Sequence, residues 1–174
     1  MLRINLLLSL FRANMYLPKG KTHFKEDTTM MKNLAEAFEK EQEIRKQYDE
    51  AKDEAGKEAA RTAHKAWENS VAENGIDFWN VYRLYSDAKE RGNEYIDLRD
   101  CIWDKDVPAL ISNLRVQGIK RFTFSSSWSS AVETAWLFQQ NGCTLEGLVE
   151  INGQCKDFHT GEYEKVHGYI FRIN

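Results

Sequence analysis

A long segment without proline constrains the fold of this chain more than any other feature. Residues 33–74 contain no proline and a single glycine, Gly56, and they are rich in Glu, Lys, Ala and Gln, which favour helix. Apolar residues recur along the segment at Leu34, Phe38, Ile44, Tyr48, Trp67 and Val71, with alanines at positions 51, 55, 59 and 63 between them. This spacing predicts one long helix or a helical hairpin with a single apolar face.

A second helix is predicted for residues 76–91, between Gly75 and Gly92. Aromatic side chains can stack on nucleic-acid bases, but such platforms interleave the aromatic residues with basic ones. Because that interleaving is missing, we expect the aromatic face of this helix to pack in the protein core. The residues of this face are Phe78, Trp79, Tyr82, Tyr85 and Ala88.

After Gly92 the pattern changes to short apolar segments that alternate with helical ones. Strands are predicted at residues 95–98, 119–124, 145–151 and 169–173. One helix is expected to begin at Asp106 and Pro108, and another at a Ser-x-x-Glu capping box formed by Ser130 and Glu133. The dipeptide Asn152-Gly153 predicts a hairpin turn before the last strand.

The predicted architecture is α/β, with a long N-terminal helical region followed by a small β-α-β-α-β-β core that contains a mixed sheet. Right-handed crossovers make the first strands parallel, and the final hairpin is expected to add the last strand as an antiparallel edge. We assign residues 30–92 to the helical region and residues 93–174 to the α/β core. Residues 1–29 are expected to be a poorly ordered leader.

The leader contains an apolar run, residues 2–11, that is too short to span a bilayer. The residues that follow this run do not resemble a signal-peptide cleavage site, so the leader is not interpreted as a secretion signal. Met30 or Met31 is the expected start of the natural product. No membrane partner is predicted.

Composition limits the function classes. With a net charge of −3, the chain has no basic excess to neutralise a nucleic-acid backbone, so direct binding of double-stranded DNA is not expected. Cys101, Cys143 and Cys155 lack Cys-x-x-Cys spacing, which argues against a disulfide framework and a cysteine zinc site and indicates a reducing cytoplasm. No cofactor is predicted.

The candidate binding site follows from the rule that ligands of open α/β sheets collect beyond the carboxyl ends of parallel strands. A serine run after the second strand leads into a helix N-terminus, where a phosphate or nucleotide could bind, although serines at this position also serve simply to end the turn. The candidate binding residues at the two strand ends are Arg99, Asp100, Trp103, Asp104, Ser125, Ser126, Ser127, Trp128 and Ser129.

No catalytic or metal site is predicted. The chain has no Gly-x-Ser-x-Gly elbow, and His159 and His167 have no diagnostic spacing. Carboxylates near the strand ends could gather around a divalent cation, but solvated surface carboxylates are the simpler interpretation. These carboxylates are Asp97, Asp100, Asp104 and Glu133.

Two stretches, GNEYIDLRDCIWD and FTFSSSWSSAVETAWLFQQNGCTLEGLVEIN, resemble a family of small bacterial proteins carried on mobile elements of gut bacteria. The resemblance extends over residues 31–174 and implies an accessory protein that binds a host or element protein complex, such as a CRISPR-type defence nuclease. It assigns a role to no residue. Trp103 and Trp128 would be binding hot spots on such a surface.

Three functions remain open from the sequence. The first is a non-enzymatic binding protein, with an anti-defence inhibitor as its specific form. The second is a small enzyme or ligand-binding domain that acts on a phosphorylated or nucleotide substrate at the serine run. The third is a structural module that forms homo-oligomers through the N-terminal helix.

Overall fold

The structure is a computed structural model that describes residues 30–99 and 103–174. The predicted leader, and Asp100 of the candidate site, lie outside these residues. The described residues form an α/β fold with a four-stranded mixed sheet, as predicted. The elements are α1 (Met30–Glu50), α2 (Glu54–Glu73), the π-helix η1 (Phe78–Tyr82), α3 (Arg83–Arg91), β1 (Ile96–Leu98), the 3-10 helix η2 (Asp104–Asp106), α4 (Val107–Val116), β2 (Arg121–Phe124), α5 (Ala131–Gln140), β3 (Cys143–Lys156) and β4 (Tyr163–Ile173).

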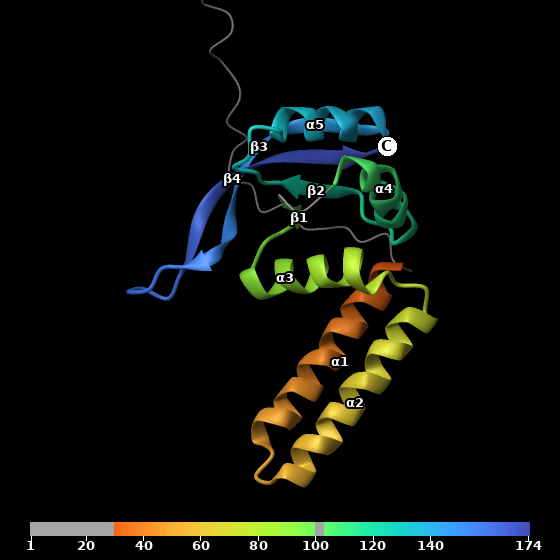
Figure 1. The fold of residues 1–174 in the computed structure, drawn as a ribbon, viewed down its shortest axis with the longest axis vertical. Helices are drawn as coiled ribbons and strands as arrows, with labels where there is room; N and C mark the ends of the chain where they lie inside the picture. Colours follow the sequence, from red (N-terminus) through yellow and green to blue (C-terminus); the bar gives the residue numbers. More distant parts are fainter. Residues whose placement is uncertain (1–29, 100–102) are drawn as a thin grey trace, which may run out of the picture.

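The long helical segment is a hairpin that projects from the α/β core (Figure 1). Asp53 ends the connection between α1 and α2, because its side chain accepts a 2.8 Å hydrogen bond from the N–H of Gly56 and caps α2. Inside the hairpin, the buried Trp67 donates its indole N–H to the carbonyl of Ala37 on α1 at 3.0 Å. Of the two predicted forms, the hairpin is the one adopted.

A buried polar contact attaches the hairpin to the core. The carboxylate of Glu41 on α1 accepts the hydroxyl of Tyr82 at 2.6 Å and a guanidinium N–H of Arg45 at 2.8 Å. Burial and the hydrogen bond to this carboxylate raise the pKa of Tyr82, so its hydroxyl remains a donor. The ring of Trp67 packs edge-on against Tyr82 with the centroids 5.1 Å apart. The hairpin is therefore joined through Tyr82 to η1, which leads directly into α3.

The predicted aromatic face is confirmed except at one position. Tyr82, Tyr85 and Ala88 are buried, whereas Trp79 is 69% exposed, with the guanidinium of Arg83 over its ring at 5.4 Å. The chain forms a π-helical turn here, and a π turn holds more residues than an α turn. The side chain of Trp79 is therefore rotated out of the face that a regular α-helix would give it.

The strand order is β1-β2-β4-β3, with β1 parallel to β2 and the other two pairs antiparallel. The prediction that the last strand forms an edge is wrong, because β4 lies between β2 and β3. Successive residues of β4, Ile170 and Phe171, are both buried, whereas successive residues of β3, Leu145 and Glu146, are both exposed. Burial on both faces favours an interior strand.

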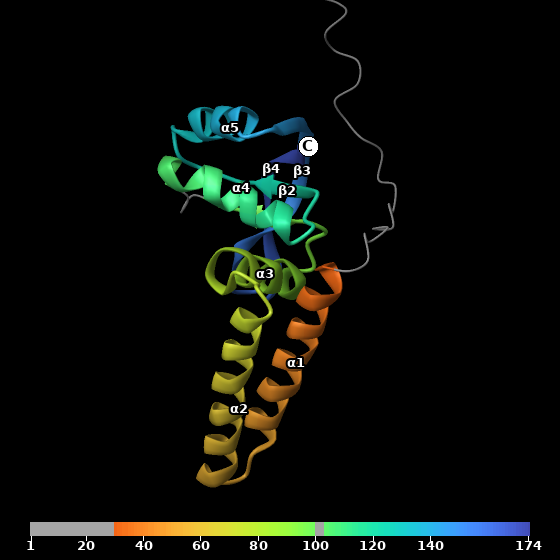
Figure 2. The same ribbon diagram turned by 90° about the vertical axis from the view of Figure 1, so that its right-hand side faces the viewer.

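Helices α4 and α5 cover one face of the sheet (Figure 2), and α3 lies beside β1. At the centre of the covered face, Phe138 of α5 packs edge-on against Phe122, Phe124 and Phe171, with centroid distances of 5.1 to 5.2 Å. The position of α5 over the strands is therefore set by one buried aromatic cluster. None of the described helices is both long enough and apolar enough to cross a lipid bilayer.

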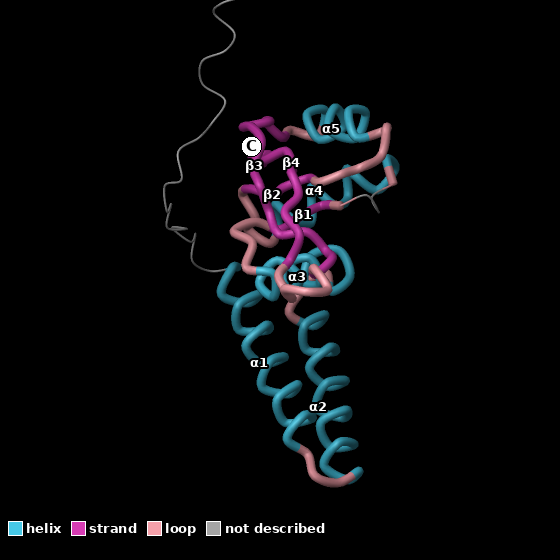
Figure 3. Tube along the Cα trace, turned by 90° about the vertical axis from the view of Figure 1, so that its left-hand side faces the viewer, coloured by secondary structure: helices cyan, strands magenta, loops and turns pink. Residues whose placement is uncertain are grey.

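The predicted hairpin turn at Asn152-Gly153 is wrong, because β3 continues through it to Lys156. The side chain of Asn93 accepts from the N–H of Asn152 at 2.8 Å and donates to its carbonyl at 2.9 Å, which holds Asn152 in extended backbone. Gly153 allows close packing, since a Cβ there would lie 2.9 Å from the Cγ of Glu164. The two strands thus extend beyond the sheet as a paired arm, residues 152–165, visible in Figures 1 and 3.

Candidate functional site

A pocket of about 690 Å³ lies at the carboxyl ends of β1 and β2, where the strand-end rule places ligands. Its size is in the range of ligand pockets in proteins. Side chains from both strand ends, from η2, from α5 and from the root of the arm line it. The lining residues are Arg99, Trp103, Asp104, Lys105, Phe124, Ser126, Trp128, Ser130, Thr134 and Gln154.

The predicted binding residues separate into two groups. Arg99, Trp103, Asp104, Ser126 and Trp128 are brought together in the pocket lining. Ser125, Ser127 and Ser129 are outside that lining. A binding role for any of these residues stays a prediction.

Ser125 is directed away from the pocket because side chains alternate along a strand, and its neighbours Phe124 and Ser126 occupy the pocket side. It donates its hydroxyl to Asp97 at 2.5 Å and its backbone N–H to the same carboxylate at 3.1 Å. The hydroxyl of Thr123 donates to Asp97 at 3.0 Å. Burial raises the pKa of Asp97, and the hydrogen bonds from Ser125 and Thr123 act in the opposite direction.

The loop between β2 and α5 is closed by its own hydrogen bonds. The hydroxyl of Ser126 accepts the N–H of Trp128 at 3.1 Å, and the carbonyl of Trp128 accepts the N–H of Ala131 at 3.1 Å. The predicted capping box is wrong, since Ser130 makes no side-chain capping bond. Its backbone angles, φ −78° and ψ 3°, are outside the extended region that a capping serine adopts.

Arg99 lies at the inner wall of the pocket, with 14% of its side chain exposed. It donates from Nη2 to the carboxylate of Asp87 on α3 at 2.5 Å, and its Nε lies 4.0 Å from the carboxylate of Asp97. The Nε atom is buried without a hydrogen-bond partner. Two carboxylates of the same chain therefore balance the charge of Arg99.

Large apolar side chains surround the pocket mouth and continue onto α5. Trp103, Trp128, Val132 and Trp136, which we call the tryptophan patch, are 73%, 64%, 69% and 60% exposed. Val132 and Trp136 are four residues apart and share one face of α5, and Trp128 lies in the turn that precedes this helix. The spacing of four that links Trp128, Val132 and Trp136 is present in the sequence, but helical periodicity alone does not show that this face is exposed.

Other candidate residues do not form a site in the described part of the chain. His159 and His167 are exposed on the arm and on β4, away from the pocket lining. Glu133 is exposed on α5. Within residues 30–99 and 103–174, no group of three or more His, Cys, Asp or Glu side chains is placed to hold a metal ion.

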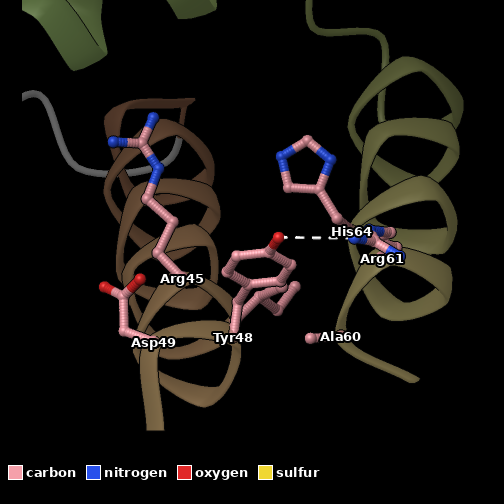
Figure 4. Close-up of a pocket in the computed structure, with 7 residues that line it drawn as sticks. Arg45, Tyr48, Asp49, Ala60, Arg61 and His64 are labelled. Carbon is pink, nitrogen blue, oxygen red and sulfur yellow. Dashed lines mark hydrogen bonds between the residues drawn. The ribbon is translucent and has the colours of Figure 1, made fainter. Parts of the chain in front are cut away.

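A second, smaller pocket of about 330 Å³ lies in the groove between α1 and α2 (Figure 4). Arg61 crosses this groove and donates to the hydroxyl of Tyr48 at 3.4 Å, with its guanidinium 5.6 Å from the ring centroid. It also donates to Glu54 at 2.7 Å and to Glu58 at 3.0 Å. Because its charge is already paired along α2, Arg61 serves to hold the two helices together.

A family model described as a domain of unknown function (DUF7698) matches residues 80–173, more than half of the 174-residue chain. The chain belongs to this family. The DUF7698 match begins within η1 and ends at the last residue of β4, so it includes the pocket, the tryptophan patch and the arm, and excludes α1 and α2. No curated protein and no solved structure matches the chain.

Proposed function

We propose that this protein is a non-enzymatic binding protein whose pocket and tryptophan patch receive a segment of another protein. The observation that carries the proposal is the exposure of four large apolar side chains beside a pocket of about 690 Å³. Two of the four, Trp103 and Trp128, line that pocket, and large exposed apolar patches mark interaction sites in soluble proteins. Tryptophan is also enriched among the residues that dominate binding energies at protein interfaces.

The alternative is a site for a phosphorylated or nucleotide ligand at the serine run. Such a ligand would need free N–H and O–H donors and an unbalanced positive charge. Ser125 gives both of its donors to Asp97, and Arg99 is already paired with Asp87. The aromatic lining of the pocket mouth suits an apolar protein side chain better than a phosphate. The pocket retains one exposed cation, Lys105, so the protein-binding proposal rests on the aromatic lining and not on a lack of positive charge.

The finer form of the proposal comes from the resemblance to proteins of mobile elements in gut bacteria. We propose on that basis an accessory factor that acts in the cytoplasm and binds a host or element protein complex, with an anti-defence inhibitor as its specific form. The tryptophan patch would supply the contact surface for such a complex. Exposed tryptophan side chains are the type of residue that dominates binding at protein interfaces once water is excluded from the contact.

The protein-binding proposal and the phosphate-ligand alternative predict different bound molecules when the protein is recovered from a host lysate. The tagged full chain is incubated with lysate, and bound proteins and bound small molecules are identified by mass spectrometry. A stoichiometric protein partner is the expected result. A phosphorylated compound recovered without a protein, together with turnover of that compound, would contradict the proposal and favour the alternative.

A further inference from the structure

The arm carries the most exposed large apolar side chain of the described residues. Phe158 is 95% exposed at the arm tip, outside the pocket and the tryptophan patch. Its ring contacts only the neighbouring His159 among the described aromatic rings, with the centroids 5.6 Å apart. A single exposed apolar residue is common on protein surfaces, so it is the way the arm presents Phe158, more than its exposure, that points to a contact.

The turn that presents Phe158 is already ordered. The carboxylate of Asp157 accepts the N–H groups of His159 and Thr160 at 2.8 and 2.7 Å, and its backbone carbonyl accepts the N–H of Gly161 at 2.8 Å. Gly161 adopts φ +71°, a left-handed conformation that favours glycine. A preorganised turn loses little conformational entropy on binding, so Phe158 is presented as a rigid anchor.

The arm is also fixed at its root. Asn152 bonds the side chain of Asn93 and donates from its own side chain to the carbonyl of Arg91 at 2.5 Å. Near the tip, the ammonium of Lys156 lies 4.7 Å from the ring centroid of Tyr163 on the opposite strand. The arm is therefore held in one direction, and its tip projects away from the core (Figure 1).

The root of the arm borders the pocket, because Gln154 is one of the pocket-lining residues. Phe158 is four residues further along the chain, beyond the end of β3 at Lys156, so it lies at most about 13 Å from Gln154. A rigid arm carries Phe158 away from the pocket of its own molecule. If the arms of two molecules lie side by side and antiparallel, the tip of each arm lies beside the root of the other. Because the pocket borders the root, each tip then lies at the pocket of the other molecule.

We propose that Phe158 of a second copy occupies the pocket, giving a symmetric dimer in which two arms exchange their tips. The contact is isologous, with two identical tip-in-pocket contacts related by a two-fold axis. Both surfaces carry exposed charges of each sign, so opposite charges can pair across the contact. These charges are Asp104 and Lys105 in the pocket lining, and Lys156, Asp157 and Glu162 around Phe158. This inference rests on the proposed function, because it takes the pocket to be a site for a protein side chain.

The proposed dimer is weak, because the paired arms and pockets form a small interface, and interfaces of that size bind transiently. Dissociation constants in the micromolar range are expected, so a tighter partner would displace the arm tip and separate the copies. Dimer formation and partner binding are then mutually exclusive at this pocket. The dimer would keep Phe158, Trp103 and Trp128 covered until a partner is present.

Sedimentation equilibrium of the purified full chain tests the proposal. A monomer–dimer equilibrium is expected, with the dimer dissociation constant raised about 100-fold in Phe158→Ala, which removes both anchors, and in the double variant Trp103→Ala/Trp128→Ala. Leu148→Ala, which truncates an exposed apolar side chain of β3 outside the arm, is the control and should dimerise as the wild type does. Phe158→Ala keeps an intact pocket, and the tryptophan double variant keeps an intact arm tip. An equimolar mixture of the two should therefore form heterodimers with one intact tip-in-pocket contact.

Two outcomes would overturn the inference. The first is a wild-type chain that stays monomeric at hundreds of micromolar, since the expected dimer dissociation constant is about 1–100 micromolar. The second is a Phe158→Ala variant that dimerises as tightly as the wild type. Failure here is distinguishable from failure of the proposed function. A monomeric chain that captures a lysate protein through Trp103 and Trp128 refutes only the dimer, whereas a Phe158-dependent dimer that captures nothing refutes the wider function.

Discussion

At the scale of single residues, ion pairing and burial shift the pKa values of two groups in opposite directions. Glu146 on β3 accepts from the Nε of Arg121 at 2.7 Å and from the Nε of Arg172 at 3.0 Å, which joins three strands of the sheet. The hydrogen bond from Arg121, with a further contribution from Arg172, lowers the pKa of Glu146. Cys143 is the opposite case, since burial raises the pKa of its thiol to about 11.

Replacing Glu146 by Gln should reduce the free energy of unfolding by about 0.5–1 kcal/mol at pH 7. A carboxyl whose pKa is lowered by folding stabilises the fold above its unfolded pKa, and this contribution is lost as pH falls through the folded pKa. The difference between wild type and Glu146→Gln should therefore begin to narrow below about pH 4.3, the pKa of an unperturbed Glu, and close as pH falls through the lower folded pKa. Urea denaturation at several pH values measures it, with the exposed Glu150→Gln as the control. A difference that is unchanged at pH 3 would refute the assignment.

The raised pKa of Cys143 predicts slow reaction with thiol reagents at pH 8, because the thiolate is the reactive form. Cys155 is exposed on the arm, so it should react first. The test is Ellman labelling of the folded chain in a Cys101→Ser background, which leaves these two thiols. One rapidly reacting thiol is expected, with a second released by denaturant. Rapid labelling of both thiols in the folded chain would show that Cys143 is accessible.

At the scale of elements, contacts between distant parts of the sequence set the positions of the arm and the loop beside the pocket. The arm root depends on Asn93, which bonds Asn152 across 59 residues of sequence. The entrance to the serine run depends on Asp97, which holds Ser125 from the neighbouring strand. Both contacts are made by the side chain of one element to the backbone of another.

Replacing Asn93 by Ala should free the N–H of Asn152 and loosen the arm while the core remains folded. Loss of these hydrogen bonds is expected to cost about 1–2 kcal/mol. Hydrogen exchange should accelerate at Asn152 and along the arm, with little change at Phe122 in the buried strand β2. The exposed Gln140→Ala on α5 is the control. Equal acceleration in the core would mean that Asn93 supports the whole fold and not the arm alone.

Most features set by local sequence patterns were predicted correctly, whereas features set by contacts between distant residues were missed. Local signals located the helices, the short apolar strands and the strand-end crevice, because apolar periodicity reports which face of each element is buried. The Asn152-Gly153 turn failed because the tertiary contact with Asn93 overrides the local preference of the dipeptide. The full pocket lining was also missed, since Thr134 and Gln154 reach the pocket only through the packing of α5 and the arm.

At the scale of the whole molecule, the chain combines a projecting helical hairpin, an α/β core and a rigid arm (Figures 1 and 2). The pocket and the tryptophan patch lie in the DUF7698 part, on the core, with the root of the arm at the pocket wall. Three of the five tryptophans of the chain, Trp103, Trp128 and Trp136, are exposed in that patch. Such a concentration of exposed aromatic surface is the main reason to regard the core as a binding surface.

The most direct test of this account is partner capture from lysate by matched tryptophan variants of the full chain. Trp103→Ala/Trp128→Ala removes two members of the tryptophan patch, whereas Trp79→Ala removes a similarly exposed tryptophan of η1 that lies outside the pocket lining. We predict that the double variant binds the captured protein at least about 30-fold more weakly than the wild type, as expected for an interface hot spot. Trp79→Ala should bind it as the wild type does. Equal capture by both variants would contradict the assignment of this surface as the binding site.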